Sequence, residues 1–185
     1  MAEQPTLKLM YFNFPGKAGA IRMALNYCGL EFEDYRFKDD RSDFTEMKTD
    51  GTSPFGQAPM LQVGGAKPAL AQSVAILRYV AKLAPASELY PADPLVAHAV
   101  DALCDQEKDF WTGQAVSKYT ARFGFGALNE EANAPLLEQI RQTVTDEIKP
   151  RHLANVEAMM KAGGTQVRVV LLALLSVRVL CSGCH

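Results

Sequence analysis

The sequence has little of several features that would narrow its function at once. Its net charge is only −2 over 185 residues and it has no basic stripe, so nothing favours nucleic acid as a partner. Of its four cysteines, Cys28 and Cys104 lie inside apolar helical patterns, where they are expected to be small core residues or free thiols. His98 and His152 stand alone on helical stretches. We therefore expect no metal site.

No apolar run is long enough to cross a membrane. Residues 167–180 come closest, but they fall short of the roughly 20 residues that a span needs, and Arg168 and Arg178 interrupt them. The N-terminus carries no basic segment followed by an apolar one, which favours a cytoplasmic location. With 48% hydrophobic residues, the chain has the composition of an ordinary globular protein of one or two domains.

The first part of the chain alternates strand and helix patterns. Residues 7–13 predict a strand that ends in a turn at Pro15-Gly16. Apolar residues at helical spacing predict a helix over residues 17–28, closed by Gly29. Residues 32–37 predict a second strand, so the chain begins with a βαβ unit and a parallel strand pair.

A hairpin and a helix follow a polar stretch over residues 38–52. Residues 60–63 and 67–70 predict two short strands joined at Gly64-Gly65. Ser73 is expected to cap the next helix. The predicted order is therefore β-α-β followed by β-β-α.

The second half of the chain has a purely helical pattern. Prolines concentrated in residues 84–94 mark a linker. One long helix is predicted over residues 95–123, and another over 135–161 that is bent or broken at Pro150. Gly163-Gly164 is expected to end it.

Two short segments of the first part predict a binding site for a peptide carboxylate. Pro59 precedes a strand and cannot donate a ladder hydrogen bond, which leaves backbone groups of its neighbour for a ligand. Gln72 and Ser73 begin a helix, where backbone N–H groups without helical partners attract anions. The two together favour a small acidic peptide as the ligand.

Five motifs, in their order and spacing along the chain, resemble those of the glutathione transferases. The nearest resemblance is to the sigma-like class, which includes the glutathione-dependent prostaglandin D synthases. The motifs are Leu9–Asn13, Gly16–Ala18, Ser53–Pro59, Ala71–Tyr79 and Val100–Asp105. The resemblance implies an α/β thioredoxin-like domain with a mixed four-stranded sheet, followed by an all-α domain.

On this resemblance the domain boundaries follow from the predicted elements. Residues 1–83 would form the glutathione-binding domain, residues 84–94 the linker and residues 95–185 the helical domain. The helical domain is expected to be truncated or atypical after about residue 165, because no acid occurs after Glu157 and no aromatic residue after Phe125. Our hypothesis is that residues from about 166 are a replaced end, from a frameshifted or alternatively spliced transcript.

Tyr11 matches the catalytic tyrosine of the family. A phenol that donates a hydrogen bond to the glutathione sulfur favours the thiolate over the thiol and so lowers the thiol pKa. The alternative is a strand tyrosine whose hydroxyl meets a backbone partner.

The resemblance also implies a set of glutathione-binding residues. They are Phe12, Lys17, Phe44, Lys48, Gln57, Ala58, Pro59, Gln72, Ser73 and Asp109. The backbone of Ala58 would pair with the cysteinyl unit, next to a cis-proline at Pro59, for which an ordinary trans turn proline is the alternative. Gln72 and Ser73 would hold the γ-glutamyl end, although Ser73 could equally be an N-cap or serve as both.

The remaining binding residues have weaker matches to the family pattern. Phe44 stands where the family has a tryptophan, and it would face the glycyl carboxylate together with Lys48, which could also be plain solvated surface. Lys17 replaces an arginine, so it keeps the charge but not the bidentate fork. Asp109 would reach across a dimer to the neighbour's glutathione, or is a solvated helix carboxylate.

Three functions follow from these patterns. The first is a cytoplasmic, homodimeric glutathione transferase that conjugates its co-substrate glutathione to small hydrophobic electrophiles, with no metal, nucleic acid or membrane involved. The second is a weakly active or inactive glutathione-binding or structural relative. The third is a truncated product with a disrupted helical domain.

Overall fold

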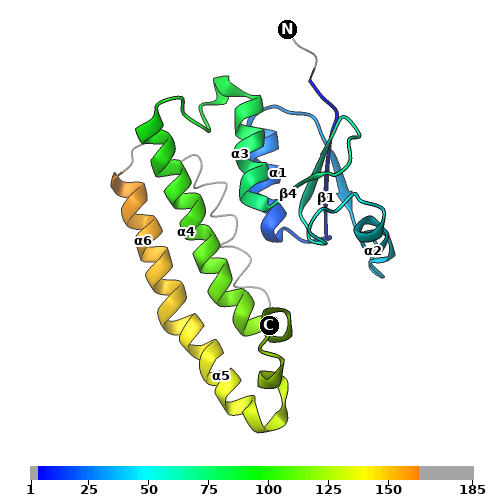
Figure 1. Ribbon diagram of the computed structural model, residues 1–185. Helices are drawn as coiled ribbons and strands as arrows, with labels where there is room; N and C mark the ends of the chain where they lie inside the picture. The colour runs from blue at the N-terminus through cyan, green and yellow to red at the C-terminus, as the bar shows by residue number, and fades with distance from the viewer. Residues whose placement is uncertain (1–3, 163–185) are drawn as a thin grey trace. The chain divides into compact units, whose positions relative to one another are not determined.

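The computed structural model describes residues 4–162 and divides into two compact units at Asp93 and Pro94 (Figure 1). Within the described residues, no helix is both long and apolar enough to cross a bilayer. The predictions for the Gly163-Gly164 helix end, the apolar stretch 167–180 and the replaced end lie outside the described residues.

The first unit is built on a mixed sheet of four strands in the order β2-β1-β3-β4. The central strand β1 pairs in parallel with β2 and antiparallel with β3, and β3 pairs antiparallel with β4. The strands are β1 (Leu7–Tyr11), β2 (Glu33–Arg36), β3 (Met60–Val63) and β4 (Leu70–Ala71). This confirms the predicted α/β class, the parallel first pair and the mixed four-stranded sheet.

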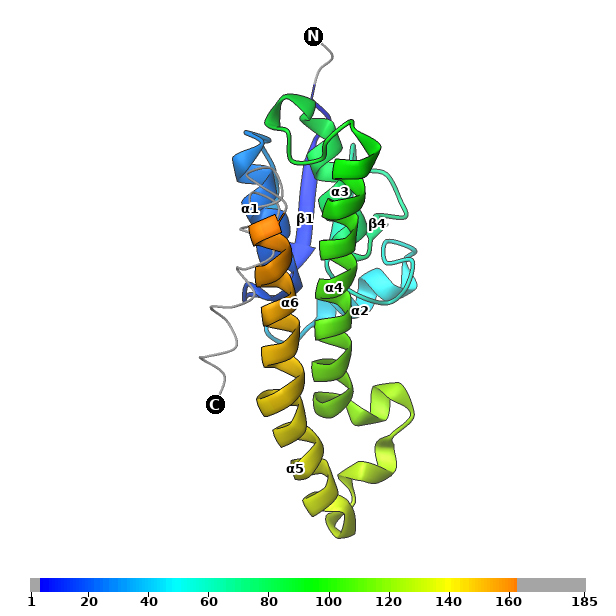
Figure 2. The same cartoon turned by 90° about the vertical axis from the view of Figure 1, so that its left-hand side faces the viewer.

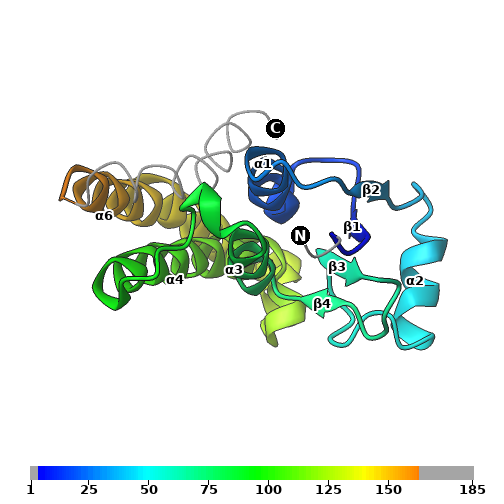
Figure 3. The ribbon, with the colours of Figure 1, turned by 90° about the horizontal axis from the view of Figure 1, so that it is seen from above.

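Helices cover both faces of this sheet. Figure 3 shows α1 and α3 on one side, in contact with each other, and α2 on the other side. The helices are α1 (Gly19–Tyr27), α2 (Ser42–Thr49) and α3 (Ser73–Leu83), with short 3₁₀ turns η1 (Gly16–Ala18) and η2 (Pro85–Ser87).

The sequence pattern was wrong about two local features of this unit. The polar stretch 38–52 contains α2, which its sparse apolar residues did not predict. Ser73 is the first residue of α3 rather than its cap, because Gln72 occupies the N-cap position and no side chain caps the helix. Gly29, by contrast, follows α1 with φ of +64°, as expected for a residue that ends a helix.

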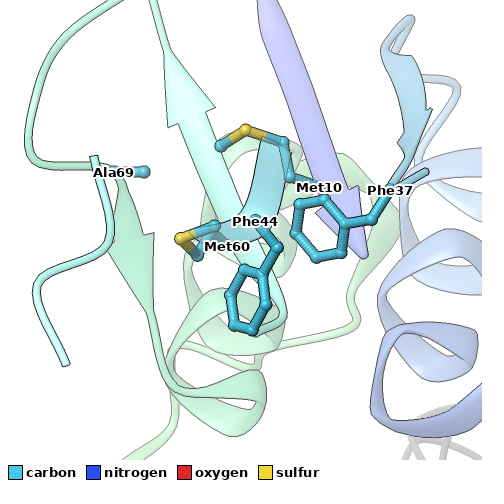
Figure 4. Close-up of a cluster of buried hydrophobic side chains, with 5 residues drawn as sticks. All are labelled: Met10, Phe37, Phe44, Met60 and Ala69. Atoms are coloured by element: carbon cyan, nitrogen blue, oxygen red, sulfur yellow. The ribbon is translucent and has the colours of Figure 1, made fainter. Parts of the chain in front are cut away.

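A buried cluster fixes α2 against the sheet (Figure 4). Met10 of β1 and Met60 of β3 are at most 1% exposed, and they pack with Phe44 of α2, Phe37 and Ala69. Because successive side chains of a strand point to opposite faces, Tyr11 faces the side of the sheet that α1 covers.

The second unit is helical. Its helix α4 (Pro94–Lys118) contacts α5 (Ala134–Thr143) and α6 (Lys149–Ala162), which run beside it (Figure 2). The short turns are η3 (Thr120–Phe123), η4 (Gly126–Asn129), η5 (Glu131–Asn133) and the π-helical η6 (Val144–Ile148). Buried side chains of this unit include Val100, Leu103, Cys104, Leu137 and Val144.

Two helix predictions for this unit need adjustment. The helix predicted over 95–123 ends at Lys118, and a 3₁₀ turn follows. The helix predicted over 135–161 is interrupted by η6, which ends at Ile148, and α6 then begins with Lys149 and Pro150. A proline removes a backbone donor and crowds the preceding turn, so an interruption just before it is the expected response.

Candidate functional site

The strand register brings the three predicted site segments to one edge of the sheet. Met10 lies opposite Met60, and Met60 lies opposite Ala71. One step further along the strands, Tyr11 follows Met10, Pro59 precedes Met60, and Gln72 follows Ala71. The end of β1, the start of β3 and the end of β4 therefore meet at this edge.

Tyr11 is nearly buried, with 6% of its surface exposed. Its hydroxyl oxygen accepts a hydrogen bond from the backbone N–H of Lys17 at 3.2 Å. A phenol that accepts such a bond is polarised and donates more strongly through its own hydrogen. The donor is the backbone N–H of Lys17, so the hydrogen bond does not depend on whether residue 17 is a lysine or the arginine of the family pattern.

Only a glycine fits at position 16. Its φ of +39° lies in the left-handed region, and a Cβ atom there would lie 2.5 Å from the Tyr11 hydroxyl oxygen and 2.7 Å from Phe14 Cε2. Both distances are below 3.0 Å, which Cβ atoms in proteins essentially never show. The turn from β1 into η1 therefore passes close to the hydroxyl only because residue 16 has no side chain.

Phe12 packs among aromatic rings beside Tyr11. Its ring centroid lies 5.3 Å from that of Tyr11, 5.1 Å from Phe37 and 5.4 Å from Phe44, all edge-to-face. It also stacks on Phe14, which is 52% exposed. Such contacts stabilise the end of β1 and couple it to α2.

Ser53 braces the loop before β3. Its hydroxyl accepts from the N–H of Gln57 at 3.1 Å and donates to the carbonyl of Gln57 at 3.2 Å, while its own N–H donates to the carbonyl of Met47. Ser53 is itself buried, whereas Gln57 is exposed. The loop is thus held closed one residue before Ala58.

Ala58 presents an open backbone. Within residues 4–162, neither its N–H nor its carbonyl has a hydrogen-bond partner. The peptide bond that joins it to Pro59 is cis, as the resemblance implies. An extended segment whose donor and acceptor are open can pair with the backbone of a bound peptide.

The start of α3 is open in the same way. The side chains of Gln72 and Ser73 make no hydrogen bond in the described part of the chain, and Gln72 is held at φ of +70°. A non-glycine residue with such a backbone costs of order 1–3 kcal/mol, and strain of this kind is typical of binding sites. The first N–H groups of α3 have no helical acceptor and attract a carboxylate.

Known proteins are similar to this chain in sequence and structure. A family profile described as "Glutathione S-transferase, N-terminal domain" matches residues 7–82. "Glutathione S-transferase 1" of Ascaris suum is 32% identical over 165 residues, which cover 89% of this chain and 72% of that protein. The chain belongs to the glutathione S-transferase family. Its predicted resemblance is confirmed.

Two further similarities place the chain near the prostaglandin D synthases of the family. "Hematopoietic prostaglandin D synthase" of Homo sapiens is 38% identical over 106 residues, which cover 57% of this chain but only 49% of that protein. The structure of "prostaglandin synthase D" of Nilaparvata lugens superposes with a TM-score of 0.72 at 25% identity, covering 95% of this chain and 82% of that one. The sigma-like character predicted from the motifs is confirmed by these relatives.

Two predicted glutathione S-transferase site residues come from α2. Phe44 is 7% exposed and its ring belongs to the core cluster. Lys48 is exposed and its Nζ lies 4.4 Å from the centre of that ring. The Cγ of Lys48 lies 4.0 Å from the position a Cβ of Gly56 would take, so the side chain runs beside the Ser53–Pro59 loop.

A buried carboxylate holds α2 to the sheet. Asp43 accepts hydrogen bonds from the Tyr35 hydroxyl at 2.7 Å and from the N–H groups of Lys38 and Phe44 at 3.1 and 2.8 Å. Burial raises the pKa of Asp43, but these hydrogen bonds outweigh burial, so the pKa lies below its ordinary value. Donating to this carboxylate raises the pKa of Tyr35.

The other end of α2 is tied to the β3–β4 connection. Asp50 follows the helix and pairs with the Lys67 ammonium, and it accepts bonds from the N–H and hydroxyl of Thr52. The ammonium, then the Thr52 donors, lower the pKa of Asp50 to about 2. Both ends of the helix that carries Lys48 are thus fixed by carboxylates.

Asp109 lies in α4, in the second unit, and is exposed. Its predicted role at the site of a partner subunit stays a prediction. Among the described residues, no group of three His, Cys, Asp or Glu side chains could hold a metal ion.

Sequence reasoning missed four residues that shape the site. Ser53 and Gly16 lie inside the quoted motifs, but their roles depend on hydrogen bonds and distances that only the folded turn creates. Asp43 lies in the polar stretch that hid α2. Arg22 looks like an ordinary polar residue on α1, and no sequence signal marks its contacts with the turn after Tyr11.

Proposed function

We propose that the protein binds glutathione at this sheet edge and ionises its thiol with the Tyr11 hydroxyl. The observation that carries the proposal is the strand register, which brings Tyr11, the open backbone of Ala58 and the start of α3 at Ser73 to one edge. A tripeptide thiol with two carboxylates suits a site with one phenol, one open backbone segment and one helix start.

Each part of the tripeptide has a proposed partner. The cysteinyl backbone pairs with Ala58, next to Pro59 and the exposed Gln57. The γ-glutamyl carboxylate accepts hydrogen bonds from the Ser73 hydroxyl and from N–H groups at the start of α3, with the Gln72 amide alongside.

The glycyl carboxylate lies toward α2 in this proposal. The Lys48 ammonium supplies the positive charge there, and the buried Phe44 ring supports the Lys48 side chain instead of binding the carboxylate itself. Lys17 adds a second positive charge near the thiol, and Phe12 keeps the end of β1 in place.

The chemistry follows from the position of the phenol. Its O–H donates to the glutathione sulfur and stabilises the thiolate, so the thiol proton leaves to solvent at a lower pH. The sulfur then uses a lone pair to form a bond to an electrophilic carbon, and the bond from that carbon to the leaving group breaks, with its electron pair going to the leaving group. Small hydrophobic electrophiles fit such a reaction, since the enzyme supplies ionisation and orientation.

We further propose that the protein works in the cytoplasm as a homodimer, with Asp109 facing the glutathione bound to the other subunit. Sedimentation of the full chain tests the dimer. If the dimer forms, Asp109→Asn should weaken glutathione binding, whereas an unchanged affinity would remove Asp109 from the site.

Tyr11→Phe tests the proposed reaction. A hydrogen bond to a charged group contributes about 1.5–3 kcal/mol, so its loss should lower conjugation of an aryl halide by roughly 10- to 100-fold. Retention on immobilised glutathione should persist. Tyr27→Phe, on an exposed tyrosine of α1, is the matched control and should keep the wild-type rate.

The outcomes separate the candidate functions. An unchanged rate in Tyr11→Phe would remove Tyr11 from the reaction. Retention on glutathione with no turnover by the wild-type chain would identify a binding relative instead of an enzyme. A wild-type chain that is not retained at all would contradict the glutathione site.

A further inference from the structure

Arg22 has more contacts than a residue on the polar face of a helix needs. It lies in α1, its side chain is 13% exposed, and its Nε lies 3.0 Å from each carboxylate oxygen of Asp34 in β2. Burial lowers the pKa of the guanidinium below its ordinary value, while the bond to Asp34 acts in the opposite direction. The charge is therefore partly buried and is paired with a carboxylate.

The same guanidinium holds the turn that follows Tyr11. Its Nη1 donates to the carbonyl of Phe14 at 3.4 Å and to that of Pro15 at 3.3 Å. Its Cζ lies 5.9 Å from the centre of the Tyr11 ring. Arg22 thus contacts both the tyrosine and the two residues that lead into Gly16 and Lys17.

We propose that Arg22 is a positioning residue for the Tyr11 hydroxyl. It fixes the carbonyls of Phe14 and Pro15, and so keeps the Lys17 N–H, two residues further on, at hydrogen-bond distance from the phenol oxygen. The consequence for catalysis rests on the proposed function, in which that phenol ionises glutathione.

A second arginine completes the support through the same carboxylate. Arg36 of β2 lies 2.6 Å from an oxygen of Asp34, and its Nη1 donates to the carbonyl of Phe12 at 3.4 Å. Asp34 therefore anchors two guanidinium groups, and each holds a different part of the segment after Tyr11. A lysine could not replace Arg22 here, because one ammonium cannot bridge a carboxylate and two carbonyls with the geometry of the planar fork.

The buried Nη2 of Arg22 supports a role beyond stability. Within residues 4–162 this atom has no hydrogen-bond partner. A buried N–H without an acceptor opposes folding, so a side chain chosen for stability alone would avoid it. The arrangement is explained if the turn carbonyls and the tyrosine determine where the guanidinium lies.

Arg22→Lys tests the proposal in the full-length chain. A misplacement of about 1 Å in a reacting group can cost on the order of 100-fold, so we expect kcat to fall by roughly 10- to 100-fold while KM for glutathione changes less. The apparent pKa of the bound thiol should rise by about one pH unit in the rate profile. Among the described residues, Arg22 lies against the phenol ring and is linked through Asp34 to Arg36, and the variant keeps the charge at all three positions.

The Lys17 amide gives a readout that does not depend on activity. Its proton resonance and its protection from exchange report the hydrogen bond to Tyr11, so both should change in Arg22→Lys. The control is Lys8→Gln, which removes a cation paired with Glu33 across the same two strands and does not touch the turn. This variant should match wild type in every measurement.

Each result decides the proposal. An Arg22→Lys variant with the wild-type pH profile and an unchanged Lys17 amide would overturn it. If that variant does not fold, Asp34→Asn takes its place, because it removes the carboxylate that holds the Arg22 guanidinium. The same pH profile and the same Lys17 amide measurements then decide the proposal. If the wild-type chain conjugates nothing, the proposed function fails, and the Lys17 amide alone decides whether Arg22 positions the turn.

Discussion

Gly16→Ala should impair the site by two separable effects. A side chain at φ of +39° costs the backbone about 1–2 kcal/mol, since L-residues avoid the left-handed region. In addition, the new Cβ would lie 2.5 Å from the Tyr11 hydroxyl oxygen and 2.9 Å from its Cε1, where ordinary contact begins near 3.4 Å. The hydroxyl must therefore move by about 1 Å, which can cost on the order of 100-fold in rate.

Gly29→Ala separates the two effects. Gly29 has φ of +64°, but nothing lies within 4 Å of the position its Cβ would take. Urea unfolding should show a loss of about 1–2 kcal/mol in both variants, with more in Gly16→Ala because of the clash. Conjugation of an aryl halide, measured well below the unfolding transition, should fall by roughly 100-fold only in Gly16→Ala.

Equal conjugation rates in the two variants would show that the Tyr11 hydroxyl does not depend on the close passage of residue 16. If Gly29→Ala also lost the rate, the loss would belong to general destabilisation, and the geometry of the turn would not explain it.

Two further predictions concern the loop and the helix around the site. Ser53→Ala removes both hydrogen bonds to Gln57, so we expect the free energy of unfolding in urea to fall by about 1–3 kcal/mol. We also expect KM for glutathione to rise by a larger factor than kcat falls. An unchanged KM would show that the loop does not need these hydrogen bonds. For Asp43, a folded-state pKa below the ordinary 3.8 means that its contribution to stability is present above that value and is lost as pH falls through the lower folded value. Asp43→Asn should lower the free energy of unfolding by about 1–3 kcal/mol at neutral pH and should make stability fall less steeply below about pH 4. Urea unfolding measured across pH tests both effects. A variant whose stability falls with acid as steeply as that of wild type would count against the role of Asp43.

Much of the first unit could be predicted because its elements have clear periods. Alternation predicted β1, and the 3.6-residue spacing predicted α1 and α3. The helix α2 has only Phe44 and Met47 as large apolar residues in eight positions, so its period is too weak to detect. Its stability comes from tertiary contacts, namely the buried Phe44 ring and the Asp43 hydrogen bonds to Tyr35, which no local pattern reveals.

The site could be predicted only as far as its motifs extend. Tyr11, Ala58 and Ser73 stand in motifs whose order resembles a known family, and the strand register explains why residues so distant in sequence meet. Arg22 could not be found in this way, because its role depends on a guanidinium that reaches two carbonyls across the turn. Periodicity assigns such a residue to a face of its helix and gives no information about what its head group contacts.

The parts of the site that would handle the thiol are largely backbone groups. The Lys17 amide donates to the Tyr11 oxygen, and the backbone of Ala58 is the segment that would meet the cysteinyl unit in our proposal. Departures from the family pattern at Lys17 and Phe44 change side chains and leave these backbone groups in place. We therefore expect the departure at Phe44 to weaken affinity for the glycyl carboxylate, and the departure at Lys17 to weaken support of the thiolate only through the lost bidentate fork. The side chains that would disturb ionisation are those that shape the turn, Arg22 above all.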